Sequence, residues 1–141
     1  MNPFNTDQVF TPLHDIAAFH EKFGLGQNNS KVVVGEARDN MHPEEWNLRH
    51  VRLADEADEY AQAVEEEDDE QALDALVDIV YIALGTAYRR GWDFAEAWRR
   101  VHTANMSKMR GEPNNSKYGS GFDIVKPKGW QSPDHTDLVT P

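Results

Sequence analysis

Apolar residues recur at helical spacing through most of this 141-residue chain. Residues 7–23 place six of them on one helical face: Phe10, Leu13, Ile16, Ala17, Phe19 and Phe23. Thr6 or the pair Thr11-Pro12 can begin this helix, and Gly24 and Gly26 end it. Residues 25–42 are rich in Asn and Gly and predict a long loop.

Two longer helices are predicted next. Pro43, followed by two acidic residues, begins one that extends to about residue 66. The other runs from about Glu70 to Arg90 and ends at Gly91. Its apolar residues cover more than one face, which predicts a second helix-packing surface and hence a homodimer or homotetramer. One apolar stripe consists of Leu76, Val77 and Val80. The apolar residues that lie outside this stripe are Ile79, Ile82 and Leu84.

Asp93 caps a fourth helix that reaches about Met109. Residues 110–141 contain Gly, Pro, Asn and Ser throughout and predict a tail of turns without a strand pair. The predicted fold is therefore all-α, a four-helix bundle with an extended C-terminal tail, in a single domain over residues 1–141.

Asp74 and Asp78 lie one helical turn apart in the most apolar stretch of the chain. No other charged residue occurs between Ala72 and Tyr88. Such a helix should be buried, and a buried carboxylate costs several kcal/mol unless a cation or good hydrogen bonds replace its hydration. Something should therefore neutralise these two side chains.

A second group of acidic residues lies upstream. On a helix, Glu59 is a neighbour of both Asp55 and Glu56. Residues 65–70 are a run of acids that suits a solvated turn. An antiparallel hairpin folded there places Asp55 level with Asp78 and Glu59 level with Asp74. Carboxylates this close repel one another, and a divalent cation would resolve the conflict. Oxygen ligands favour Mg²⁺ first, with Mn²⁺ and Ca²⁺ next.

Simpler interpretations of these residues stay open. Asp74 and Asp78 can face a solvent groove or pair with an arginine. Glu56 and Glu59, taken alone, suit a solvated helix face. Arg52 can be the i, i+4 partner of Glu56 or a phosphate contact.

Composition narrows the class of protein. The net charge of −11 argues against broad nucleic-acid binding, although residues 99–141 hold seven Lys and Arg against four acids. The absence of cysteine excludes disulfides and thiolate zinc sites. No signal peptide or membrane-length apolar stretch is visible, so we expect a cytoplasmic protein with no membrane partner.

Three motifs resemble the MazG-like all-α nucleoside triphosphate pyrophosphohydrolases, in the phage-type branch related to phosphoribosyl-ATP pyrophosphohydrolase. The first is Asp55-Glu56-x-x-Glu59 with Asp74-Ala-Leu-Val-Asp78, in which Ala75 stands where the family usually has Glu. The others are Val101-His-Thr-Ala-Asn105-Met-Ser-Lys108 and Lys126-Pro-Lys-Gly-Trp130-Gln-Ser-Pro133. The resemblance covers roughly residues 8–134.

The resemblance implies Mg²⁺-dependent cleavage of a (deoxy)nucleoside triphosphate to the monophosphate and pyrophosphate. The substrate would be a purine, with dGTP a candidate by analogy with one phage branch, and the compartment would be the host cytoplasm if the protein is viral. Glu56, Glu59 and Asp78 would bind metal. Asp55 and Asp74 would be further ligands or would orient the attacking water. The substrate would contact Arg52, Asn105, Lys108, Lys126, Lys128 and Trp130, with the tail closing over the site.

Two alternatives remain at this stage. One is a pyrophosphohydrolase for another nucleotide, such as dUTP, dCTP or phosphoribosyl-ATP. The other is a non-catalytic helical module that binds metal or nucleotide, which the alanine at position 75 favours.

Overall fold

The computed structural model describes residue 4 and residues 6–25 and 42–139. The chain divides after Trp92 into two compact units, which are described separately. The first unit contains the helices α1 (Pro12–Lys22), α3 (Pro43–Glu65) and α4 (Asp69–Arg90). Apart from its two end residues, the loop expected over 25–42 lies outside the described residues.

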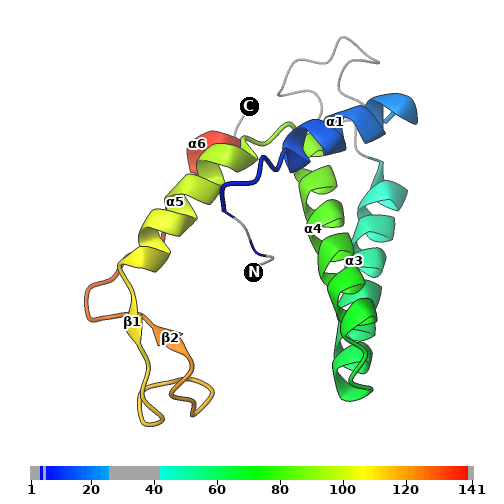
Figure 1. Cartoon of the computed structure of the whole chain (residues 1–141). Helices are drawn as coiled ribbons and strands as arrows, with labels where there is room; N and C mark the ends of the chain where they lie inside the picture. Colours follow the sequence, from blue (N-terminus) through cyan, green and yellow to red (C-terminus); the bar gives the residue numbers. More distant parts are fainter. Residues whose placement is uncertain (1–3, 5, 26–41, 140–141) are drawn as a thin grey trace. The chain divides into compact units, whose positions relative to one another are not determined.

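Helices α3 and α4 lie side by side as an antiparallel hairpin, and α1 lies across α4 (Figure 1). The expected start signals hold, since Pro12 and Pro43 occupy the first turns of α1 and α3. The Asp68 side chain accepts a hydrogen bond from the Gln71 N–H at the start of α4. Gly91 ends α4 with φ of 68°, a left-handed conformation that glycine adopts without strain.

The core that the described residues of the first unit form is small. The buried apolar residues among them are Ile16, Ala63, Ala75, Leu84 and Ala87. The expectation that α4 is buried is only partly met, because Leu73 is 64% exposed and Val77 is 54% exposed. The exposed surface also differs from the one expected. Leu84 is buried, whereas the stripe expected to face the bundle, which includes Leu76 and Val80, is exposed.

Helix α4 is long and apolar enough, by length and composition alone, to cross a membrane. The core helix of a soluble protein passes the same test. Here α4 packs against α3 and α1 and carries Asp74 and Asp78.

The second unit contains α5 (Phe94–Met106), the strands β1 (Met109–Arg110) and β2 (Ile124–Val125), and the short helix α6 (Thr136–Val139). Asp93 caps α5 as expected. The expectation of no strand pair is wrong, because β1 and β2 form a two-residue antiparallel pair. Gly111 makes this pairing possible, since a Cβ there would lie 2.9 Å from the Asp123 carbonyl oxygen. The all-α fold class is confirmed, because helices dominate the described chain.

The small core makes a single buried side chain important. Ile16 is 2% exposed and seats α1 on the hairpin. We expect Ile16→Ala to lower the free energy of unfolding by about 2–5 kcal/mol in urea denaturation, because it removes buried methyl groups and leaves a cavity. Val9→Ala is the control, since Val9 is 86% exposed. Equal losses from both variants would show that α1 does not depend on this packing.

Candidate active site

The α3–α4 hairpin brings three of the predicted carboxylates together. Glu56 and Glu59 lie one turn apart on α3, and Asp78 faces them from α4. Glu56 is half-buried, and its Oε2 atom is shielded from solvent without a hydrogen-bond donor among the described residues. A shielded carboxylate oxygen with no donor is costly, and a cation is the usual way to satisfy one.

The pKa of Glu56 is shifted by its surroundings. Loss of solvent raises the pKa of Glu56, and the negative charges of Glu59 and then Asp78 raise it further. The positive charge of Arg52 acts in the opposite direction and lowers the pKa. Glu56 therefore holds a proton more readily than an ordinary glutamate.

The other two predicted metal ligands, Asp55 and Asp74, are more exposed to solvent than Glu56. Asp55 and Asp74 are exposed on their helices, whereas Asp78 is half-buried. Among the described residues, the charges that most affect Glu56 are those of Glu59, Asp78 and Arg52. Ala75 is 2% exposed, so the position where the family usually has glutamate is part of the core.

The donor set suits a hard divalent cation, because it consists of carboxylate oxygens alone. Within the described residues, no three His, Cys, Asp or Glu side chains already stand in a metal-binding arrangement. Glu56, Glu59 and Asp78 would have to draw together around an ion, which their mutual repulsion opposes until the ion is bound. The shielded Oε2 atom of Glu56 is the observation that fits such an ion best.

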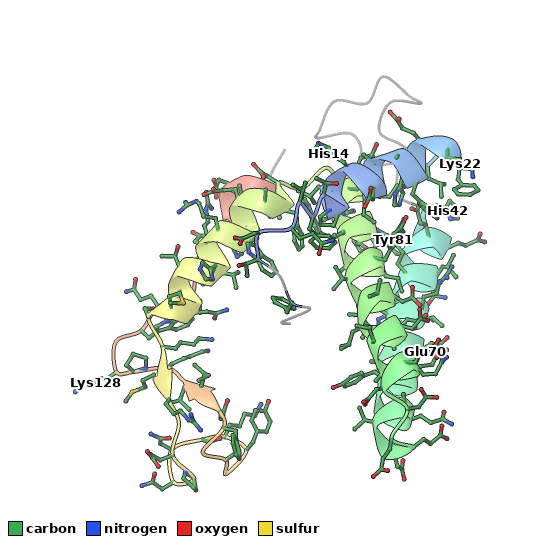
Figure 2. All side chains as sticks on the ribbon, in the orientation of Figure 1. His14, Lys22, His42, Glu70, Tyr81 and Lys128 are labelled. Atoms are coloured by element: carbon green, nitrogen blue, oxygen red, sulfur yellow. The ribbon has the colours of Figure 1, made fainter. Side chains whose placement is uncertain are left out.

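A pocket of about 480 Å³ lies between α1, α3 and α4, and Arg52 lines it. One side is aromatic, with Phe19 and Tyr81 in edge-to-face contact at 5.3 Å between ring centroids. Tyr81 lies on α4 where α1 crosses that helix (Figure 2). The polar side includes His20, Glu45 and Arg49. Because Arg52 is one turn from Glu56, the pocket adjoins the carboxylates.

An ion-pair network forms the polar wall. Arg89 donates two hydrogen bonds to Glu45, of 2.7 Å and 2.8 Å, and a third to the Leu25 carbonyl. Arg49 donates to Glu45 at 3.3 Å and contacts Nε2 of His20 at 3.1 Å. The hydrogen bonds of Arg89 are the largest cause of the lowered pKa of Glu45, so this carboxylate stays ionised.

His20 is neutral in this network. Its Nδ1 contacts the Ile16 carbonyl at 2.8 Å, and a carbonyl can only accept, so Nδ1 carries the proton. Nε2 is then an acceptor for the Arg49 N–H. Burial is the main cause that lowers the pKa of His20, and the charges of Arg49 and Arg89 lower it further. A second proton on His20 would oppose the contact with Arg49.

The remaining predicted substrate contacts belong to the second unit. Trp130 donates from Nε1 to the Ala104 carbonyl and the Ser107 hydroxyl, both at 2.9 Å, and so fixes the tail to α5. Lys108 and Lys126 lie over its ring, at 5.0 Å and 5.1 Å from the centroid. Asn105 and Lys128 are exposed, and Lys128 points away from its unit (Figure 2). That the tail closes over the carboxylates stays a prediction.

Sequence reasoning missed Arg49, Glu45, His20 and Arg89. The first two continue the helical face of Arg52, Glu56 and Glu59 towards the start of α3, at spacings of three and four residues. Extending that face would have identified them. His20 and Arg89 give no comparable signal, because their partners lie on other helices.

The site thus consists of a helical hairpin that groups acidic side chains from two long helices beside a pocket of about 480 Å³. The family model described as phosphoribosyl-ATP pyrophosphohydrolase matches residues 17–105. This match covers more than half of the chain, and the protein belongs to this family. A comparison with curated proteins finds no match. The family assigns the chain to nucleotide pyrophosphohydrolases, hydrolases that act on acid anhydrides.

The raised pKa of Glu56 makes a prediction about stability. Folding disfavours the charged form of Glu56. The free energy of unfolding therefore falls as the pH rises from about 4.5, the ordinary pKa of a glutamate, through the raised pKa of Glu56 in the folded protein. In buffer without divalent ions, Glu56→Gln should therefore raise the thermal midpoint at pH 7, and the gain should vanish below the ordinary pKa. Glu65→Gln, an exposed acid of α3, is the control. A lower midpoint for Glu56→Gln at pH 7 would contradict the account.

Proposed function

We propose that the protein hydrolyses a (deoxy)nucleoside triphosphate, between the α- and β-phosphates, to the monophosphate and pyrophosphate. The observation that carries this proposal is the group formed by Glu56, Glu59 and Asp78, with one shielded oxygen that lacks a donor. A pocket with an aromatic side and a basic side adjoins this group. That combination suits a ligand with a planar base and a chain of phosphates.

Mg²⁺, with Mn²⁺ as a substitute, is the proposed cofactor; when bound it would offset the charge of the phosphates and lower the pKa of a bound water. Glu56, Glu59 and Asp78 would hold it. Asp74 and Asp55, which are exposed nearby on the same helices, would add a ligand or orient the attacking water. Arg52 would contact a phosphate, because it lies one turn from Glu56 and lines the pocket.

The tail supplies further cations in this proposal. Lys108 and Lys126 are held together by Trp130, so they present two positive charges in one place. With Asn105 and Lys128 they would contact the phosphates, and Trp130 would anchor the segment. The family match ends at residue 105, so these roles rest on the motifs of the tail.

The preferred substrate is a purine triphosphate, with dGTP as the first to test because the motifs resemble a phage branch. A cytoplasmic setting, the host's if the gene is viral, suits such an enzyme. Phosphoribosyl-ATP is the second candidate, because the matching family bears that name. A binding module without turnover is a third, since Ala75 is part of the core and offers no carboxylate.

A panel of NTPs, dNTPs and phosphoribosyl-ATP, each with Mg²⁺ or Mn²⁺, tests the reaction. We expect a monophosphate, or its phosphoribosyl equivalent, together with pyrophosphate. Asp78→Asn should lower turnover by about 100-fold or more, because it removes a charged ligand, without lowering the thermal midpoint. Release of orthophosphate and a diphosphate would contradict the position of cleavage. Absence of turnover with intact nucleotide binding would favour the binding module.

We also propose that the active protein is a homodimer, or a pair of dimers, joined through an apolar groove between α1 and α4. The groove has a volume of about 390 Å³ and is lined mainly by apolar side chains. Phe10 at its edge is 78% exposed, and Val80 on its floor is 50% exposed. An exposed apolar surface of this kind on a small core favours association with a second copy.

Charge placed in the groove should disrupt such an assembly. We expect Val77→Lys to shift the sedimentation coefficient to that of a monomer. Val64→Lys is the matched control, because Val64 on α3 is 53% exposed, about as exposed as Val77, but does not line the groove. A wild-type protein that sediments as a monomer, or a Val77→Lys variant that stays associated, would contradict the proposed interface.

A further inference from the structure

The network in the pocket wall carries an unbalanced positive charge. Arg49 and Arg89 are both cationic, Glu45 is ionised, and His20 is neutral. Arg52 and Glu44, one cationic and one anionic, also line the pocket. Within the part of the chain that the structure describes, this network therefore has one positive charge more than negative charges, on side chains that are mostly shielded from water.

This surplus charge belongs to Arg49. Arg89 takes both oxygens of Glu45 in a two-pronged ion pair of 2.7 Å and 2.8 Å, whereas Arg49 has one longer bond of 3.3 Å. The side chain of Arg49 is only 15% exposed. A cluster that served structure alone would be expected to balance its charges, because an uncompensated cation away from water destabilises the fold.

The guanidinium is also held in place. Nε2 of His20 accepts from Arg49, and Gly85 of α4 gives both groups room. A Cβ at position 85 would lie 3.0 Å from Nη1 of Arg49 and 3.0 Å from Cε1 of His20. A charged donor fixed by its neighbours before the ligand arrives binds without the cost of ordering a free side chain.

Arg49 lies on the helical face that leads to the carboxylates. Arg49, Arg52, Glu56 and Glu59 follow one another at spacings of three and four residues on α3. With a rise of 1.5 Å per residue, Arg49 is about 10 Å along the helix from Glu56. The hairpin thus has an acidic region and a basic region, and a molecule that reached from one to the other would meet both.

We infer that Arg49 is a further substrate-binding residue that binds phosphate oxygens in the pocket, with Glu45 and His20 as positioning residues. This inference rests on the proposed function, since it assigns the phosphate end of the same substrate. A guanidinium has five N–H donors, so Arg49 has donors for phosphate oxygens beyond those that it gives to Glu45 and His20. The competing interpretation is that Arg49 only ties α1 to α3 through His20.

Binding of inorganic pyrophosphate to the full chain, measured by calorimetry without divalent ions, tests the inference. We expect the wild type to bind, and Arg49→Gln to weaken binding by about tenfold or more, because charge-assisted hydrogen bonds are lost. Arg99→Gln is the matched control, since Arg99 is 65% exposed and pairs with Glu96 in the second unit. No binding by the wild type, or equal affinity in Arg49→Gln, would overturn the inference.

Further variants separate positioning from structure. Arg49→Lys keeps the charge but loses the planar fork, so it should fold and bind pyrophosphate with intermediate affinity. If Arg49→Gln does not fold, the pyrophosphate affinity of Arg49→Lys tests the inference instead. Gly85→Ala, which displaces Arg49 and His20, should weaken binding and raise KM more than it lowers kcat. Unchanged affinity in both variants would leave Arg49 with a structural role alone.

The two proposals can fail separately. If no nucleotide is hydrolysed but pyrophosphate binding depends on Arg49, the anion site stands and the proposed reaction fails. If nucleotides are hydrolysed and Arg49→Gln retains the wild-type KM and pyrophosphate affinity, the reaction stands and this inference fails.

Discussion

The site depends on the repulsion among Glu56, Glu59 and Asp78. Helix α3 and helix α4 pack closely enough to shield an oxygen of Glu56 and to raise its pKa through its two acidic neighbours. A protein selected only for stability would replace such a group, because apolar residues of similar size pack without this cost. We propose that the carboxylates are kept for binding, and that a bound cation would relieve the repulsion that folding creates among them.

The other end of the hairpin is organised by opposite charge. Arg89 and Glu45 link α4 to the start of α3, and Arg49 links both to His20 of α1. The same contacts that seat α1 on the hairpin also shape the basic wall of the pocket, so structure and ligand binding share residues there. The hairpin therefore has a basic region at one end and an acidic region further along. A substrate whose phosphates bind both a cation and the arginines would suit this arrangement. The exposed apolar groove, which Tyr81 also lines, adds a surface that one copy of the chain leaves uncovered.

The helices were predictable because their signals are local. Pro12, Pro43, Asp68 and Asp93 begin helices, and Gly91 ends one, by interactions within a few residues. The predicted hairpin of α3 and α4 is present, and the negative charge of Asp78 acts on Glu56 from the other helix. The pair of β1 and β2 was missed because two residues give no alternation to detect. The His20 network was missed because it joins three helices through side chains whose proximity only the fold determines.

The most direct test of the account is the position of a bound ion. In crystals grown or soaked with Mn²⁺, anomalous diffraction locates the metal independently of any activity. The account predicts a peak between α3 and α4, within coordination distance of carboxylate oxygens of Glu56, Glu59 and Asp78, with the shielded oxygen of Glu56 among its ligands. A peak confined to the exposed acids of the hairpin turn, or no peak at these three residues at saturating Mn²⁺ with bound nucleotide, would contradict it.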